Sequence, residues 1–411
     1  MRIFFCFVLV LFTLVFPFSS RVQSATPNLE SYLSSDQFQA GEAAFSAQLS
    51  QSPQDDRARF SLGVLQLMDG TERLMQLLYR YGLRQNTFTS LLPILRLPVP
   101  NNPKPQPITY EDTRQILQTL LADLTKVRST LDSIQDRSLK VPIRMGLVRM
   151  DFNNDGKLET AESFWSVFTR ISGIRTTEQA AKAFTINFDA GDVAWLRGYC
   201  NLISAIVETV LAYDERQLFN ATAHLMFTKP QTPYPFLADG RKVFQFGDNL
   251  DLVDVVAFIH LVNFPVLEPQ RLTNALQHLQ STLALSRESW KLIGAETDND
   301  REWLPNPKQK GVIPNAVVTQ PMIDSWLSFI GESEQLLAGQ KLVPFWRSRE
   351  VRGINLNKVF TQPQPFDLVL WIQGTAPAPY LELGKQTDST VWQQLLSVFG
   401  GRFFGFAAWF N

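Results

Sequence analysis

The sequence predicts a mainly α-helical, multi-helix globular protein. Several long stretches carry apolar residues at the three- and four-residue spacing of one helix face, whereas the short runs typical of strands are few. Of the 411 residues, 45% are hydrophobic and 19% are charged, which is the composition of a folded chain with a sizeable core. The length fits one large domain or two to three smaller ones.

The charge balance limits the kinds of partner that the chain can have. The formal net charge is −1 and no stretch is strongly basic, so we do not expect nucleic-acid binding. Phenylalanine is abundant, at 31 residues against 8 tyrosines. This excess indicates either large buried cores or an apolar binding surface.

Residues 1–24 predict a secretory signal peptide. Arg2 precedes an apolar run at residues 3–18, which is short for a membrane span. Val22 and Ser24 place small or aliphatic residues where a signal peptidase acts, so we expect cleavage after Ser24. The alternative is an uncleaved anchor. No later segment is long and apolar enough to span a bilayer.

Cleavage would leave a chain without disulfides. It removes two arginines and no acid, so 38 basic and 39 acidic residues become 36 and 39, a net charge of −3. It also removes Cys6, which leaves Cys200 alone. An exported protein of this size without disulfides is more typical of a bacterial periplasm or exterior than of a eukaryotic secretome. Cys200 lies in an apolar helical stretch, so we expect a buried, inert thiol rather than a nucleophile.

Residues 25–96 predict an N-terminal helical hairpin. Its spacings weakly resemble a tetratricopeptide repeat, on the positions Phe45, Pro53, Leu62 and Gly63. Only about one repeat is visible, and a solenoid needs at least about three. The proline-rich run "LPVPNNPKPQP" at 97–107 is a predicted linker, since prolines at this density stop both helix and sheet.

Residues 108–295 predict a central helical domain. Thr109 and Asp112 have the spacing of a capping box at the head of a long helix. Further helical patterns begin at Asp192, at Asp248 to Asp251, and after Pro265. The pattern after Asp192 predicts a broad buried stripe made of Leu196, Cys200, Leu202, Ile203, Ile206, Val207, Val210 and Leu211.

The central domain contains the run "DFNNDGKLETAE" at 151–162. Its first, third, fifth, seventh, ninth and twelfth positions, which supply oxygen ligands in a calcium loop, are Asp151, Asn153, Asp155, Lys157, Glu159 and Glu162. Lys157 would contribute its backbone carbonyl, Glu159 would bind directly or through water, and Glu162 would give two oxygens. Gly156 stands at the sixth position, where the turn needs a glycine.

This run resembles the EF-hand family at every loop position, together with flanking segments of about 30 residues in all. The resemblance implies one bound Ca²⁺ between two helices, with Leu158 packed under the loop. "SLKVPIRMGLVRM" would be the entering helix, shortened by Pro142, and "TAESFWSVFTRI" the exiting one. Two alternatives are an acidic helix N-terminus that binds no ion and a dockerin-like module, although we see no duplicate of the loop.

EF-hands usually occur in pairs, and the next helix–turn–helix pattern lies at about 177–200. Its segment "TIN" at 185–187 could pair with the "KLE" edge of the first loop at 157–159. Its turn lacks the ligand set, so we assign it no ion. A degenerate second hand and an unrelated helix pair both stay open.

A second acidic run, "ETDNDREWLPN" at 296–306, opens the predicted C-terminal α/β subdomain, residues 296–411. Its acids do not fit the loop spacing. We interpret it as a solvated turn, or else as part of a site built with other segments. Paired carboxylates could also perform glycosidase-type acid–base chemistry, so the alternative function is an extracellular hydrolase. No histidine, serine or glycine motif of a known catalytic type is present, so we assign no catalytic residue.

The rest of this subdomain predicts one helix at 319–339 and a small β element at 341–346 and 366–374. The aromatic end at 399–411 indicates either a buried segment, which we favour, or a recognition patch. Taken with the leader and the loop, "ETDNDREWLPNPKQ" and "FDLVLWIQG" look similar to an uncharacterised group of exported bacterial proteins. We therefore expect a secreted or periplasmic calcium-binding protein with a structural Ca²⁺ and a binding or scaffolding role, whose partner is an unknown protein or extracellular ligand.

Overall fold

The computed structural model describes residues 26–86, 89, 95, 97–172, 177–239, 245–246, 250–313, 317–347, 351–400, 403 and 406–407. The predicted signal peptide lies outside these residues, and so does Asp248. Cleavage after Ser24 therefore stays a prediction.

The prediction of a mainly α-helical, multi-helix protein is confirmed. The described α-helices are α1 (Leu29–Ser34), α2 (Phe38–Gln51), α3 (Asp56–Arg80), α5 (Tyr110–Leu131), α6 (Phe164–Ser172), α7 (Glu178–Ala183), α8 (Ala190–Leu211), α9 (Arg216–Met226), α10 (Phe236–Asp239), α11 (Leu252–Leu261), α12 (Pro269–Ala295), α13 (Gln320–Leu337), α14 (Leu356–Thr361), α15 (Leu368–Gln373) and α16 (Ser389–Phe399). Two short 3₁₀ turns are η2 (Met145–Leu147) and η3 (Ala378–Tyr380).

The described strands are short. They are β1 (Lys140–Ile143), β2 (Ile186–Asp189), β3 (Gln245–Phe246), β4 (Leu250–Asp251), β5 (Asn263–Phe264), β6 (Val343–Pro344), β7 (Arg352–Ile354), β8 (Phe366–Asp367) and β9 (Leu381–Leu383). All of their pairings are antiparallel: β1 with β2, β3 with β4, β5 with β8, and the order β6–β7–β9 in the largest sheet.

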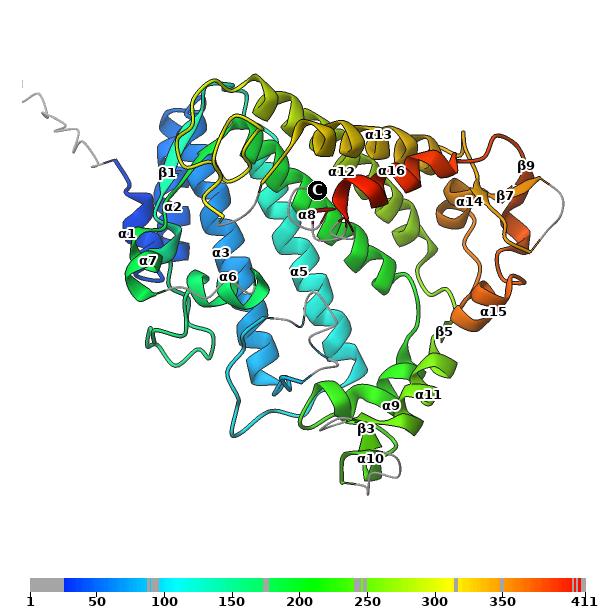
Figure 1. Ribbon diagram of the computed structural model, residues 1–411. Helices are drawn as coiled ribbons and strands as arrows, with labels where there is room; N and C mark the ends of the chain where they lie inside the picture. Colours follow the sequence, from blue (N-terminus) through cyan, green and yellow to red (C-terminus); the bar gives the residue numbers. More distant parts are fainter. Residues whose placement is uncertain are drawn as a thin grey trace, which may run out of the picture.

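The long helices form a chain of neighbours. α2 packs on α3, α3 on α5, α5 on α8, α8 on α12, α12 on α13, and α13 on α16. Figure 1 shows α3, α5 and α8 together in the body of the molecule, with the sheet of β7 and β9 and the helices α14 and α15 at one side. The apolar faces of these amphipathic helices are therefore buried against each other.

Local sequence accounts for where the two central helices begin. Thr109 and Asp112 form the predicted capping box at the start of α5. α8 begins slightly before the predicted Asp192, because Asp189 is its N-cap and Asp192 completes a second capping box. The predicted buried stripe is wrong at Ile206 and Val210, which are 43% and 40% exposed.

In the region predicted as an N-terminal hairpin, α2 and α3 pack together across a short turn. Gly63 of α3 allows the close approach of α5, because a Cβ there would lie 2.5 Å from Leu131 Cδ2. Residues 97–107 contain neither helix nor strand, as the proline content predicts. The hydrophobic core takes residues from both sides of this segment and from beyond residue 296. The division into separate domains stays a prediction.

The small β element near the C-terminus is confirmed, but its second part is smaller than predicted. Within 366–374 only β8 is a strand, and α15 follows it directly. The Asp367 carboxylate accepts the Leu370 N–H at 2.8 Å, and Gly374 ends the helix at φ +105°. An N-cap and a C-cap glycine with six residues between them thus make a short helix in an otherwise apolar run.

The described part of the aromatic C-terminal end is mostly buried. Phe399 and Phe406 belong to the core, and the Phe406 ring stacks on Trp290 with centroids 6.0 Å apart. Phe403 packs against Trp326 at 5.9 Å. The prediction of burial is confirmed for Phe399 and Phe406, while Phe403 is half-buried and 408–411 lie outside the described part of the chain.

Candidate metal centre

The loop at 151–162 is closed at its base by backbone pairing. Arg149 and Ser163 form an isolated antiparallel bridge, and the Met150 N–H donates to the Glu162 carbonyl at 3.2 Å. α6 leaves the loop, as predicted for the exiting helix. The two ends of the loop are therefore held side by side.

The segment that enters the loop is not a helix. Residues 138–150 contain β1 and the single turn η2, with Pro142 inside the strand. Proline is excluded from a helix interior, and β1 instead pairs with β2 over four residues. The predicted entering helix is therefore wrong, and the unit is a strand, a turn, a loop and a helix.

Inside the loop, the backbone turns around the first predicted ligand position. The Asp151 carboxylate is 5% exposed and accepts the Asp155 N–H at 3.2 Å and the Gly156 N–H at 2.8 Å. Gly156 has φ +76°, which an L side chain rarely adopts. The chain thus turns tightly around the Asp151 carboxylate.

The side chains at the third and fifth positions also accept hydrogen bonds from loop N–H groups. The Asn153 side-chain oxygen accepts the Asp155 N–H at 2.9 Å, and the Asp155 carboxylate accepts the Lys157 N–H at 2.9 Å. Asn154 between them has φ +58°. These turns keep the side-chain oxygens at the first, third and fifth positions close to the loop backbone.

Glu162, the twelfth position, reaches back across the loop. Its carboxylate is 3% exposed and accepts the Phe152 N–H at 3.2 Å and the Glu159 N–H at 3.1 Å. Burial raises the pKa of Glu162, and the negative charges of Asp151 and Asp155 raise it further. A cation among these groups would offset that repulsion.

Two side chains of helix α3 form hydrogen bonds with the loop backbone. The Asp151 N–H donates to the Glu72 carboxyl at 2.5 Å, and the Gln76 amide donates to the Asp151 carbonyl at 2.9 Å. Burial and a hydrogen bond with Asp36 raise the pKa of Glu72 to about 9. Asp36, between α1 and α2, and Glu72 and Gln76 of α3 could not be assigned to the loop from sequence, because only tertiary packing brings them there.

Two expectations about the surroundings of the loop are wrong. Leu158 is 40% exposed and is not packed under the loop. Residues 185–187 do not pair with 157–159, because β2 pairs with β1.

A close group of three carboxylates in the described part of the chain lies elsewhere. Oxygens of Asp189, Glu296 and Glu302 lie within 4.8 Å of one another, whereas the loop carboxylates do not form such a group. The buried Asp192 carboxyl adds to this crowding, and burial raises its pKa well above the ordinary range. Burial, followed by the charge of Asp189, raises the pKa of Glu296 to about 8.

The second acidic run is therefore divided between two environments. Glu296 and Glu302 turn inward toward Asp189, while Asp298 and Asp300 are exposed, and Asp298 pairs with Lys140. The interpretation as a solvated turn fits only the exposed pair. Asp189 could not be assigned to this group from sequence, because the β1–β2 pairing and the packing of α8 on α12 bring it there.

A cavity of about 700 Å³ lies beside the loop unit. Met150 before the loop and Phe164, Val167 and Phe168 of α6 line one wall, and α3, α5 and α8 line others. The space is large enough to hold solvent or a small apolar molecule.

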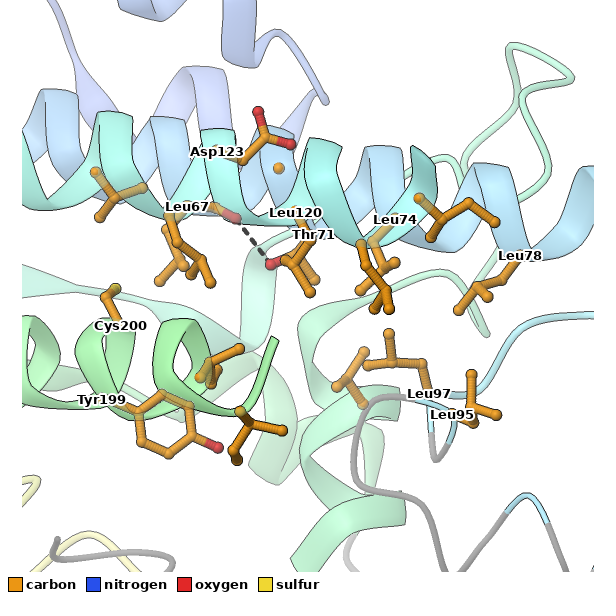
Figure 2. Close-up of a pocket in the computed structure, with 18 of the residues that line it drawn as sticks. Leu67, Thr71, Leu74, Leu78, Leu95, Leu97, Leu120, Asp123, Tyr199 and Cys200 are labelled. Carbon is orange, nitrogen blue, oxygen red and sulfur yellow. Dashed lines mark hydrogen bonds between the residues drawn. The ribbon is translucent and has the colours of Figure 1, made fainter. Parts of the chain in front are cut away.

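Cys200 faces this cavity (Figure 2) and is 1% exposed. Burial raises the pKa of its thiol to about 12. The thiolate, which is the reactive form, is disfavoured at neutral pH. The predicted burial of Cys200 is confirmed.

Comparisons of the chain with protein-family models, curated proteins and solved structures give no match. The resemblances to EF-hand proteins and to exported bacterial proteins accordingly rest on the quoted residues. None of the helices in the described part of the chain is both long and apolar enough for a membrane span.

Proposed function

We propose that this chain is an exported calcium-binding protein in which the loop at 151–162 holds one structural Ca²⁺. The observation that carries the proposal is the Asp151 carboxylate, which accepts two loop N–H groups beside a glycine of positive φ. The ligand set is Asp151, Asn153, Asp155, the carbonyl of Lys157, Glu159 and Glu162. Oxygen ligands of this kind and number are those that calcium prefers.

The surroundings of the loop explain what the ion would stabilise. The loop joins β1 and η2 to α6, and α3 contacts it through Glu72 and Gln76. Neutralising the acids of the loop would favour the folded arrangement of all three elements. The binding or scaffolding role that we propose for the whole protein uses this stabilised surface, with a protein or extracellular molecule as the partner.

A structural role fits a single loop better than a sensor role does. At 177–200, α7 leads into β2, and Asp189 at the end of that strand caps α8 directly. These residues are all described, and no twelve-residue loop lies between the helices. Cooperative calcium sensing by paired loops therefore has no second site in this segment.

Calorimetric titration of the mature chain with Ca²⁺ tests the proposal. One site should appear with a dissociation constant on the order of micromolar to millimolar, the range of extracellular modules and weak sensors. Glu162→Gln should weaken binding at least about tenfold, because a glutamine offers one oxygen and no charge. Lys157→Ala should leave binding unchanged, since only the carbonyl is used.

Glu302→Gln is the matched control, because Glu302 is a glutamate buried to the same extent in the other carboxylate group. It should leave the affinity of the loop unchanged. If Glu302→Gln abolishes binding and Glu162→Gln does not, the ion lies at Asp189, Glu296 and Glu302, and the assignment of the loop is wrong.

The alternative, an extracellular hydrolase, would use the carboxylate group of Asp189, Glu296 and Glu302. The observation in its favour is the raised pKa of Glu296 beside a second acid, which is the pattern of an acid–base pair. Against it, none of these three acids is among the lining residues of the large cavity. Hydrolysis of a polysaccharide substrate that is lost in Glu296→Gln would favour this alternative.

Export is the remaining part of the proposal. It predicts that the protein recovered from the periplasm or the medium begins at Ala25. Mass spectrometry of the intact exported protein measures this directly. Retention of residues 1–24 would support the anchor instead.

A further inference from the structure

The large cavity has a chemistry that the calcium proposal does not use. Figure 2 shows Leu67, Leu74 and Leu120 among its lining side chains, with Leu95 and Leu97 at one end. Leu67 and Leu74 belong to α3 and Leu120 to α5, while Cys200 faces them from α8. Side chains from distant parts of the chain thus form one continuous apolar wall.

The threonine hydroxyl groups of the lining donate to carbonyls of their own helices. Thr71 donates to the Leu67 carbonyl at 2.8 Å (Figure 2), and Thr222 donates to the Leu218 carbonyl at 2.7 Å. Asp123 accepts from Arg73 at 2.9 Å. These polar side chains are therefore already paired, and the walls present mainly hydrocarbon to an occupant.

The charged residues of the lining also form hydrogen bonds with other residues of the protein. Arg114 donates to the Leu211 carbonyl at 2.8 Å and to Glu268 at 2.7 Å, and the Tyr110 hydroxyl donates to Glu215 at 3.1 Å. In contrast, the Tyr199 hydroxyl makes no hydrogen bond with the described residues. It leaves one polar contact available beside an otherwise apolar space.

The cavity reaches the surface beside α8 and α11. Ile206 and Val210 line it and are partly exposed, and Phe258 of α11 lines it on the other side. Deeper lining residues such as Val127 and Phe168 are almost completely buried. An α-helix with its side chains is about 10–12 Å across. A partner helix is therefore too wide to enter a cavity whose inner lining residues are almost completely buried. A single flexible aliphatic chain fits this shape.

We propose that the cavity binds the long acyl chain of a lipid, either a free fatty acid or a phospholipid. Ligand pockets of about 300–1,000 Å³ with mainly apolar walls and few polar groups are typical of small-molecule sites, and this one has about 700 Å³. The acyl chain would lie between α3, α5 and α8 and enter beside Ile206 and Val210. The inference does not rest on calcium binding.

The test uses the mature chain and two probes. Dansyl-labelled undecanoic acid should bind saturably with increased dansyl emission and be displaced by oleate, if the source is a free fatty acid. Vesicles that contain pyrene-labelled phosphatidylglycerol should lose excimer emission when protein extracts the lipid, if the source is a phospholipid. A response in either arm supports the proposal, and a response in neither overturns it.

Leu120→Trp places a larger side chain in the cavity and should weaken binding at least about tenfold in the arm that responds. Leu383→Trp, at an exposed position of β9 outside the lining, should not change it. Ile203→Phe, also in the lining, repeats the test if Leu120→Trp does not fold. Equal affinity of the wild type and a folded cavity variant would overturn the proposal, because the probe would then be bound elsewhere.

Discussion

Replacing Glu162 by glutamine should lower the melting temperature in calcium but not in chelator. In calcium, the wild type gains about 2.7 kcal/mol when the ion is present at about 100 times its dissociation constant. The entropy of unfolding is about 2.1 cal/mol/K per residue, or roughly 0.8 kcal/mol/K for the mature chain. The gain therefore corresponds to about 3 °C. A site weakened about tenfold keeps about 1.4 kcal/mol of it, so the variant should melt at least about 1.6 °C lower than the wild type.

In chelator the same substitution has two opposing effects. It removes a carboxylate that burial and the charges of Asp151 and Asp155 disfavour. It also leaves one of the N–H groups of Phe152 and Glu159 without its acceptor, which costs about 1 kcal/mol. These effects offset each other to within about 1 kcal/mol, so the two proteins should melt within about 1 °C.

Differential scanning calorimetry of both proteins, with calcium and with chelator, measures the four melting temperatures. Glu302→Gln makes the same chemical change at another buried glutamate and should shift the melting temperature equally in both conditions. An equal loss for Glu162→Gln in both conditions would show that Glu162 only closes the loop through hydrogen bonds. Equal melting of the wild type with calcium and chelator would refute the structural role of the ion.

Four further outcomes are expected. Cys200 should react with a thiol reagent far more slowly in the native than in the unfolded protein, because it is buried and its pKa is about 12; equal rates would contradict this. In chelator, stability measured by urea titration should fall as the pH rises from about 4.5 to about 8 and then level off, because over this range folded Glu296 holds a proton that the unfolded chain has lost. Glu296→Gln should remove that part of the fall, and an unchanged profile would show that another group causes it. Asp367→Ala should cost about 1 kcal/mol in denaturant unfolding through the lost cap of α15, whereas no loss would show that packing alone maintains this helix. Chelation of calcium should weaken acyl-chain binding, because Met150 and Phe168 lie in the cavity wall next to the loop; identical affinities would mean that the two sites are independent.

The sequence by itself determined the features that depend on near neighbours. The helical class, the capping box of Thr109 and Asp112, and the helix predicted at 319–339 follow from local patterns and are present in the structure. The ligand spacing of the loop is likewise a local property, and the turn at Gly156 has the backbone that the spacing predicts. A twelve-residue loop carries most of its own geometrical information, because its hydrogen bonds are made inside it.

Only the tertiary structure decided the features that join distant segments. The pairing of β1 with β2 replaced the expected entering helix and removed the strand expected beside Leu158. The same pairing and the packing of α8 on α12 bring Asp189 to Glu296 and Glu302, more than 100 residues later in the sequence. The cavity likewise depends on where α3, α5 and α8 leave space, which no single helix pattern specifies. An apolar stripe predicts that a helix face is covered, but only packing decides whether side chains or a cavity lie against it.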